Sequence, residues 1–245
     1  MVCVGYICVY WFDIDQTFAI FLRPSNTMKK LLFTAAALVM AWTGLLPAQA
    51  QDISGDAAAG SRKIAMCMGC HGIEGYRGTF PRVYRVPKIS GQGAGYIVAA
   101  LTAYKQGQRK HPTMQGIASA LSDQDMADIA AYYASRGSMG MTVADKAVDK
   151  AGLELVTRGG CVGCHGANLS QPILPTYPKI AGQHPDYLFA ALSAYKMNTH
   201  PLWGRENPVM GAVVQPFSNI ELHELARYVS SLPGSLRTTP EGGFK

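Results

Sequence analysis

Two short stretches of this sequence almost coincide, because residues 67–72 read CMGCHG and residues 161–166 read CVGCHG. In each stretch two cysteines stand three positions apart, and a histidine directly follows the second cysteine. Cysteine and histidine side chains are strong metal and cofactor ligands. A chain that binds such a group twice must enclose it twice, so this feature constrains the fold more than the composition does.

The two stretches hold four of the six cysteines of the chain, namely Cys67, Cys70, Cys161 and Cys164. Disulfide frameworks usually join distant segments, a purpose that cysteines three positions apart serve poorly. A zinc site would use the cysteines but would leave the adjoining histidines unexplained. C-x-x-C-H is the pattern that attaches a c-type haem, with both thiols bonded to the haem vinyl groups. The sequence therefore predicts two covalently bound haem c groups, each with its iron, and zinc and disulfides are the alternatives.

Residues 28–50 have the organisation of a secretory signal peptide. Met28 is followed by two lysines, an apolar run over residues 31–46 and the sequence Ala-Gln-Ala at 48–50. These are the charged, apolar and cleavage-site regions of such a signal. The apolar run is shorter than the roughly 20 residues of a membrane span, although a retained anchor is the alternative. We expect cleavage after Ala50 and export to the periplasm.

Residues 1–27 fit neither a signal peptide nor an anchor. They precede the methionine that a signal peptide would use, and Asp13 and Asp15 interrupt an otherwise apolar stretch. We interpret this segment as a non-native N-terminal extension. The remaining length is enough for one mid-sized domain or two small ones.

The chain has a formal net charge of +6, but no long run of lysine or arginine. This pattern does not indicate binding to nucleic acid. The excess of basic residues is better interpreted as a solvated surface that helps to steer an acidic redox partner.

The similarity of the two halves extends well beyond the cysteines. Residues 87–105 read PKISGQGAGYIVAALTAYK, and residues 178–196 read PKIAGQHPDYLFAALSAYK. Likewise LSDQDMADIAAYYAS at 121–135 matches FSNIELHELARYVSS at 217–231. The spacing between the copies changes only in the segments between these blocks. The sequence therefore predicts two similar domains, over residues 51–138 and 148–245, joined by a linker over 139–147.

Apolar periodicity predicts helices in both halves. The last block of each domain carries one apolar helix face, formed by Met126, Ile129, Ala130 and Tyr133 and by Leu222, Leu225, Ala226 and Val229. Each of these helices begins with a capping signature, Ser122 with Asp125 and Ser218 with Glu221. Further helices are expected at Ile97–Tyr104 and Leu188–Tyr195, and at residues 57–66 and 152–157. No stretch shows strand alternation, so we predict an all-α fold with a few helices wrapped around one covalent haem in each domain.

The axial ligands of the two irons follow from position and from the repeat. His71 and His165 directly follow the second cysteine of each motif, which points each imidazole at the iron. A ligand on the other side should recur in register, and Met114 and Met210 do so, each with a proline two residues before it. Methionine and histidine are a common ligand pair in cytochromes c, so we expect these four residues to ligate the irons.

Other histidines and aromatic residues have simpler interpretations. His111 and His200 are the alternative sixth ligands, because both precede prolines near the two methionines. They are not in register with each other, so we interpret them as solvent-facing loop residues. His184 and His223 are expected on the surface or at helix caps. The recurring pairs Tyr104/Tyr195 and Tyr132/Tyr228 are interpreted as helix-face core, with haem packing or a hydroxyl bond to a haem propionate as the alternative.

These motifs together resemble the dihaem cytochrome c4 family of class I c-type cytochromes. The resemblance rests on C-x-x-C-H-G, PKISGQ or PKIAGQ, AYK, the methionine loop and LSDQDMADIAAYY, over residues 52–233. It implies that the carbonyl groups of Pro87 and Pro178 accept from the ring N–H of the proximal histidines and orient them. It also implies two neighbouring haems in a periplasmic shuttle, which takes electrons from a quinol–cytochrome c oxidoreductase and passes them to a terminal oxidase.

A methionine in the sixth position leaves no open site on the iron, which favours an electron carrier over an enzyme. The main alternative is a dihaem electron-transfer subunit of a dehydrogenase, such as a flavocytochrome sulfide dehydrogenase. A haem enzyme, such as a peroxidase, would need a vacant or labile sixth position. Peripheral association with the membrane is compatible with either role.

Overall fold

The structure is a computed structural model, which describes residues 54–137, 149–197 and 200–238. The expected N-terminal extension, signal peptide and linker lie outside these ranges. All the described residues belong to one compact unit.

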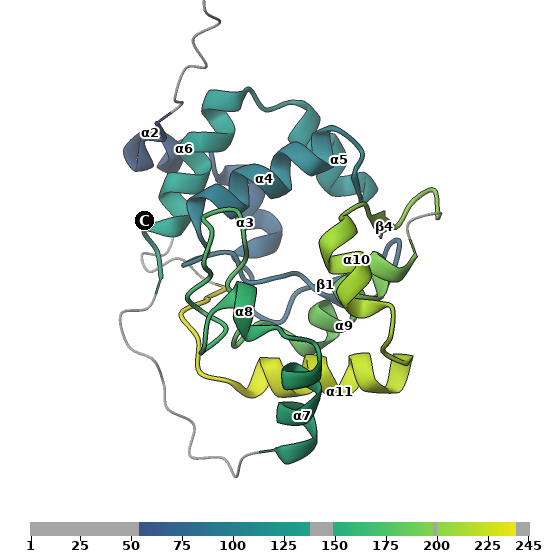
Figure 1. Cartoon of the computed structure of the whole chain (residues 1–245). Helices are drawn as coiled ribbons and strands as arrows, with labels where there is room; N and C mark the ends of the chain where they lie inside the picture. Colours follow the sequence, from purple (N-terminus) through teal and green to yellow (C-terminus); the bar gives the residue numbers. More distant parts are fainter. Residues whose placement is uncertain (1–53, 138–148, 198–199, 239–245) are drawn as a thin grey trace, which may run out of the picture. The chain divides into compact units, whose positions relative to one another are not determined.

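Both halves consist of short helices in the same order along the chain (Figure 1). The first half has α2 (Ala57–Ser61), α3 (Ala65–His71), α4 (Ala94–Lys105), α5 (Pro112–Ser119) and α6 (Asp123–Ala134). The second half has α7 (Lys150–Arg158), α8 (Val162–His165), α9 (Pro185–Lys196), α10 (Pro208–Val214) and α11 (Asn219–Ser231). In the first half α6 packs against α2 and α4, and in the second half α11 packs against α7 and α9. The equivalent helices thus make equivalent contacts, as a repeat requires.

Two short antiparallel strand pairs accompany the helices. β1 (Arg77–Gly78) pairs with β2 (Tyr84–Arg85) within the first half. β3 (Arg109–Lys110) pairs with β4 (Gly204–Arg205) and so joins the two halves. Periodicity predicts none of them, because two residues are too few to show the alternation by which a strand is recognised.

The helix expected over residues 57–66 is in fact two helices, α2 and α3. The break places Ile64 in the core, where only 8% of it is exposed. It also lets the Lys63 ammonium reach the Asp128 carboxylate in α6, with Nζ and Oδ2 2.6 Å apart. These long-range contacts outweigh the helical periodicity of the segment.

The starts of α6 and α11 are those that the sequence predicts. Both helices have a complete capping box, in which the serine hydroxyl accepts from the third backbone N–H and the acidic side chain accepts from the serine N–H. In α11 the acid of this box, Glu221, also pairs with Arg158 at the end of α7. The cap therefore also ties α7 to α11.

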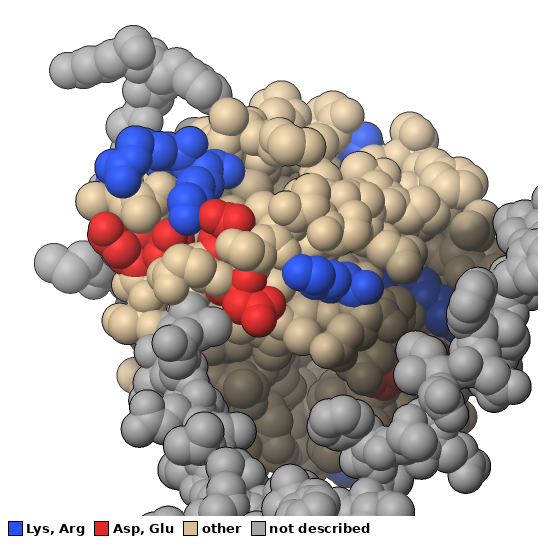
Figure 2. All heavy atoms as spheres, turned by 90° about the horizontal axis from the view of Figure 1, so that it is seen from above, with Lys and Arg blue, Asp and Glu red and all other residues tan. Residues whose placement is uncertain are grey.

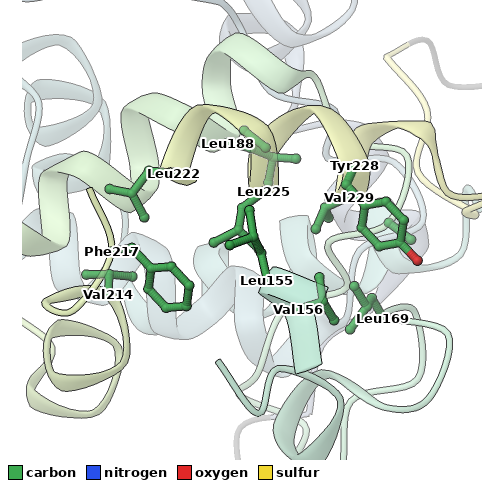
Figure 3. Packing of buried hydrophobic residues seen from close by; sticks show 12 residues of the cluster. Leu155, Val156, Leu169, Leu188, Val214, Phe217, Leu222, Leu225, Tyr228 and Val229 are labelled. Carbon is green, nitrogen blue, oxygen red and sulfur yellow. The ribbon is translucent and has the colours of Figure 1, made fainter. Parts of the chain in front are cut away.

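The core of each half is made by the helix faces that the periodicity identifies. In the second half, side chains of α7, α9 and α11 point towards one another (Figure 3). Those of Leu222, Leu225 and Ala226 are at most 4% exposed. In the first half Met126, Ile129 and Ala130 are buried to the same degree. Met126 is therefore a core residue, as expected.

No helix in the described ranges is long and apolar enough to cross a membrane. On the face in Figure 2, a group of basic and acidic side chains lies together, and broad uncharged areas make up much of the rest. This part of the surface is mixed in charge rather than uniformly basic.

Candidate functional site

One cavity of about 620 Å³ is lined by both C-x-x-C-H motifs and by both predicted methionine ligands. The eight side chains concerned are Cys67, Cys70, His71, Met114, Cys161, Cys164, His165 and Met210. The fold therefore gathers all the residues that the sequence singles out for cofactor binding. None of the four cysteines forms a disulfide, and no three His, Cys, Asp or Glu side chains in the described ranges cluster as a metal site.

Each motif histidine is held by a carbonyl group from a later segment. The ring Nδ1 of His71 lies 2.9 Å from the Pro87 carbonyl oxygen, and that of His165 lies 2.8 Å from the Pro178 oxygen. A ring whose Nδ1–H donates to a carbonyl presents Nε2 as the nitrogen that can bind a metal. This is the contact that the family resemblance implies for the two prolines.

The surroundings keep both histidines neutral. Burial lowers the pKa of His71 and of His165 and outweighs the opposing effect of the proline carbonyls. For His71 the positive charge of Arg109 lowers the pKa further. Neutral imidazole is the form that coordinates iron, so both rings are in the state that ligation requires.

The two methionines lie near the start of equivalent helices, α5 and α10, rather than in loops. Each helix has proline as its first residue, a position where proline is favoured because it needs no N–H bond there. Met114 and Met210 are half-buried and pack against the core of their own half. Each is thus presented to the cavity from a helix.

His111 is not the solvent-facing loop residue that we expected. It is the N-cap of α5, and its Nδ1 accepts from the Met114 N–H at 3.4 Å. Asn207 does the same for α10, with Oδ1 2.9 Å from the Met210 nitrogen. The shared signal is an N-cap residue, proline, any residue and methionine, visible in the sequence as HPTM and NPVM.

The other histidines lie close to where the sequence places them. His200 and His223 are exposed, and the His223 ring lies tilted against that of Phe189, with the ring centres 5.2 Å apart. His184 is the N-cap residue of α9. Burial, with the nearby charges of Lys88 and Arg85, lowers the pKa of His184 to about 4.

A reciprocal set of hydrogen bonds joins the two halves next to the histidine-binding prolines. The Gln183 amide accepts from the Lys88 N–H at 2.9 Å and donates to the Lys88 carbonyl at 2.8 Å. Gln92 makes the same two bonds to the backbone of Lys179, both at 2.9 Å. Each lysine directly follows a proline that bonds a motif histidine. The repeated PKISGQ and PKIAGQ blocks therefore hold the two halves together as well as orienting the histidines.

The cavity suits a large apolar ring that carries carboxylates. Its walls are mostly aliphatic and aromatic, with Ile97, Leu101 and Leu188 among them. They also contain three arginines, Arg77, Arg109 and Arg205. The Nε of Arg109 is buried and has no hydrogen-bond partner in the described part of the chain. The residues present thus fit haem, with its apolar macrocycle and its acidic propionates.

Comparison with known proteins matches both halves to one family. The cytochrome c family model matches residues 57–136 and again residues 150–233. Cytochrome c4 of Pseudomonas aeruginosa is 34% identical over 213 residues, which cover 84% of this chain and all of that protein. The thiosulfate dehydrogenase electron acceptor of Stutzerimonas stutzeri is 30% identical over 201 residues, 77% of this chain and 90% of that protein.

Solved structures agree with these matches. The crystal structure of reduced recombinant cytochrome c4 from Pseudomonas stutzeri has a TM-score of 0.55 and 34% identity, covering 73% of this chain and all of that chain. Thiosulfate dehydrogenase TsdBA from Marichromatium purpuratum has a TM-score of 0.52 and 28% identity, covering 68% of this chain but only 36% of that chain. The similarity extends over both halves of the described structure.

Proposed function

This chain belongs to the cytochrome c4 family, and we propose that it is a periplasmic shuttle that takes single electrons from a quinol–cytochrome c oxidoreductase and passes them to a terminal oxidase. As a protein of this family it has two tandem cytochrome c domains with two covalently bound haem c groups, and it carries electrons rather than acting as an enzyme. The haem iron supplies the redox chemistry, since it alternates between the ferrous and ferric states.

In this proposal each domain binds its own haem. The thiols of Cys67 and Cys70 hold one haem and those of Cys161 and Cys164 hold the other. The observation that supports the assignment best is the repeated arrangement around the cavity. Each motif histidine is fixed through Nδ1 by a proline carbonyl, and the two methionines line the same cavity.

The axial ligands that we propose are His71 and Met114 for the first iron and His165 and Met210 for the second. Methionine sulfur is a soft, neutral donor, and histidine with methionine gives a comparatively high reduction potential. The methionine sulfur would also occupy the position at which oxygen or peroxide could bind the iron. The Nδ1–H bonds to Pro87 and Pro178 keep the two imidazoles in a fixed tautomer and orientation, so little rearrangement accompanies a change of oxidation state.

A second candidate is that the electron donor is a dehydrogenase of sulfur compounds. It is favoured by the 30% identity to the thiosulfate dehydrogenase electron acceptor of Stutzerimonas stutzeri, which covers 90% of that protein. A flavocytochrome sulfide dehydrogenase is another donor of this class. Two stopped-flow experiments distinguish these candidate donors. In one the oxidised protein is mixed with a reduced dehydrogenase, and in the other with a reduced quinol–cytochrome c oxidoreductase. The physiological donor is expected to reduce the haems faster and with a rate that falls as salt screens the charges.

The oxidised absorption spectrum of the haem-loaded protein, scaled to haem content, tests the ligand assignment. We expect the weak far-red band of methionine sulfur on ferric iron at an intensity that corresponds to two haems. Intensity for a single haem would mean that one iron is open or has another ligand, and the carrier assignment would then fail for that domain.

A further inference from the structure

Two arginines, Arg109 and Arg205, face each other where the two domains meet. They are direct partners in the antiparallel pair of β3 and β4, and both line the cavity of the C-x-x-C-H motifs. Each stands five residues before the methionine of its own domain. They are therefore equivalent residues of the repeat that the fold brings to one place.

Neither guanidinium group has a carboxylate partner among the ion pairs of the described residues. Their polar contacts are tyrosine hydroxyl groups. Arg109 Nη1 donates to the Tyr96 oxygen at 3.2 Å, and Arg205 Nη1 donates to the Tyr195 oxygen at 3.4 Å. The Arg109 guanidinium also lies 4.6 Å from the centre of the Tyr104 ring.

One hydroxyl group joins the two arginines. The Tyr187 oxygen accepts from Arg109 Nη2 at 2.7 Å and from Arg205 Nη2 at 3.1 Å. Tyr96 is the equivalent residue of the first domain. Among the hydrogen bonds between described residues, Tyr96 accepts from one arginine, which is Arg109. Tyr187 therefore couples the first domain to the second, whereas Tyr96 belongs to the first domain alone.

The cluster carries two positive charges, and no carboxylate among the described residues pairs with them. Burial lowers the pKa of Arg109 and Arg205, but the surrounding tyrosines raise it above its usual value, so both stay charged. Burial raises the pKa of Tyr187, and the two guanidinium groups more than compensate and lower it to about 7. Charges withdrawn from water are costly unless anionic groups pair with them. The unused donor at Arg109 Nε shows the same deficit.

We propose that Arg109, Arg205 and Tyr187 form one shared cationic site that binds propionate groups of both haems and links the two haem potentials across the domain boundary. Guanidinium groups match carboxylates in geometry and bind them through two parallel hydrogen bonds. Both arginines line the cavity that holds the two haem-attachment motifs, so the carboxylates of either haem can meet them. This inference rests on the proposed carrier role and names residues that tune it.

In this site each arginine would influence the reduction potential of both haem irons. A nearby positive charge disfavours the more positive ferric state, and it therefore raises the reduction potential. Because the two guanidinium groups face each other and share Tyr187, neither acts on its own haem alone. A charge removed from one domain should then lower the potential of the haem in the other domain as well.

Redox titration of the haem-loaded full-length protein, followed in the visible spectrum, tests this directly. Arg109→Gln and Arg205→Gln should each lower both midpoint potentials. For the nearer haem we expect the ferrous-to-ferric ratio at a fixed potential to fall about tenfold. This change corresponds to a decrease of about 59 mV in a one-electron midpoint potential. Arg109→Lys, which keeps the charge, should recover most of the shift. Arg82→Gln is the matched control, since Arg82 is exposed and stacks on Trp203, and it should change neither potential.

Removal of a single hydroxyl group distinguishes one shared site from two separate sites. Tyr187→Phe should shift both potentials, whereas Tyr96→Phe should shift one. If Tyr187→Phe leaves either haem at its wild-type potential, or if Arg82→Gln shifts both haems as much as Arg109→Gln, the shared site is disproved. Normal reduction of the same variants by their donor would keep the carrier role intact. Failure of the wild-type protein to accept electrons from any donor would instead overturn the proposed function.

Discussion

Gln92 of the first domain and Lys179 of the second exchange two hydrogen bonds. The Gln92 Oε1 accepts from the Lys179 N–H, and the Gln92 Nε2 donates to the Lys179 carbonyl, both at 2.9 Å. A side-chain amide thus satisfies both backbone groups of one residue, as a neighbouring strand would. Gln183 does the same for Lys88. Because these lysines directly follow Pro87 and Pro178, the domain contact and the carbonyls that bond the histidines belong to the same segments.

The first prediction concerns this contact. Gln92→Ala removes the hydrogen-bond partners of the N–H and carbonyl of Lys179, which should lower the free energy of unfolding by about 1–3 kcal/mol. Gln183→Ala should have a similar effect, since both glutamines are 4% exposed. Denaturant unfolding of the haem-loaded protein measures it. Gln215→Ala, on an exposed residue that ends α10, is the control and should change stability little; equal losses in all three variants would contradict the prediction.

The second prediction concerns the sixth ligand. Met114→Ala should lower the midpoint potential of one haem and open that iron to an added ligand such as imidazole, because the soft sulfur donor is lost. Met210→Ala should do the same for the other haem. Potentiometric titration and ligand binding followed by absorbance measure the two effects. Met197→Ala, at a methionine that is 48% exposed, should have neither effect, and an unchanged potential in both ligand variants would refute the axial assignment.

The third prediction concerns two helical glycines with opposite surroundings. A Cβ on Gly60 of α2 would lie 2.1 Å from the Asp128 backbone oxygen in α6, whereas one on Gly116 of α5 would meet no atom within 4 Å. Gly60→Ala should therefore cost about 1–3 kcal/mol through overpacking. Gly116→Ala should stabilise the protein by about 0.5–1 kcal/mol, because alanine is the better helix former. Thermal unfolding measures both, and a stabilising Gly60→Ala would show that α2 does not pack on α6 in this way.

The fourth prediction is a pH dependence centred on Asp128, which is 3% exposed. The Asp56 N–H, the Lys63 ammonium and the Gln124 amide lower its pKa to about 2. A lowered carboxyl pKa adds stability that is complete above the unfolded value of about 4. This stability is lost as the pH falls towards 2.

Asp128→Asn should therefore lower the unfolding temperature at pH 7, and the difference from the wild-type protein should shrink between about pH 4 and pH 2. Calorimetry of the haem-loaded protein across this range is the measurement. Glu224→Gln, at the equivalent position of α11, is the control, because Glu224 pairs with Arg227 on the surface. A difference that stays constant down to pH 2 would show that Asp128 does not titrate in this way.

Periodicity and motif spacing predicted much of the site. The in-register recurrence of Met114 and Met210 pointed to two residues that the fold does place on the cavity wall with both C-x-x-C-H motifs. The capping pairs Ser122/Asp125 and Ser218/Glu221 also form as predicted. These features were visible because each depends on residues close together in the sequence.

Other features were missed because the individual residues carry no distinctive pattern. His111 looked like a loop histidine, and its role became clear only once α5 was seen to begin at Pro112. Arg109 and Arg205 were not singled out among the basic residues of the chain. Tyr195 was interpreted as a helix-face core residue, but its hydroxyl accepts from Arg205.

The sequence by itself determined that two similar helical domains each carry a haem-attachment motif, since short-range spacing, caps and a repeat suffice for that. Only the tertiary structure decided how the domains meet. The pairing of β3 with β4 and the bonds of Gln92 and Gln183 join residues far apart in the chain. Such contacts depend on the relative placement of whole helices, which no local pattern encodes, and they bring Arg109, Arg205 and Tyr187 to one place.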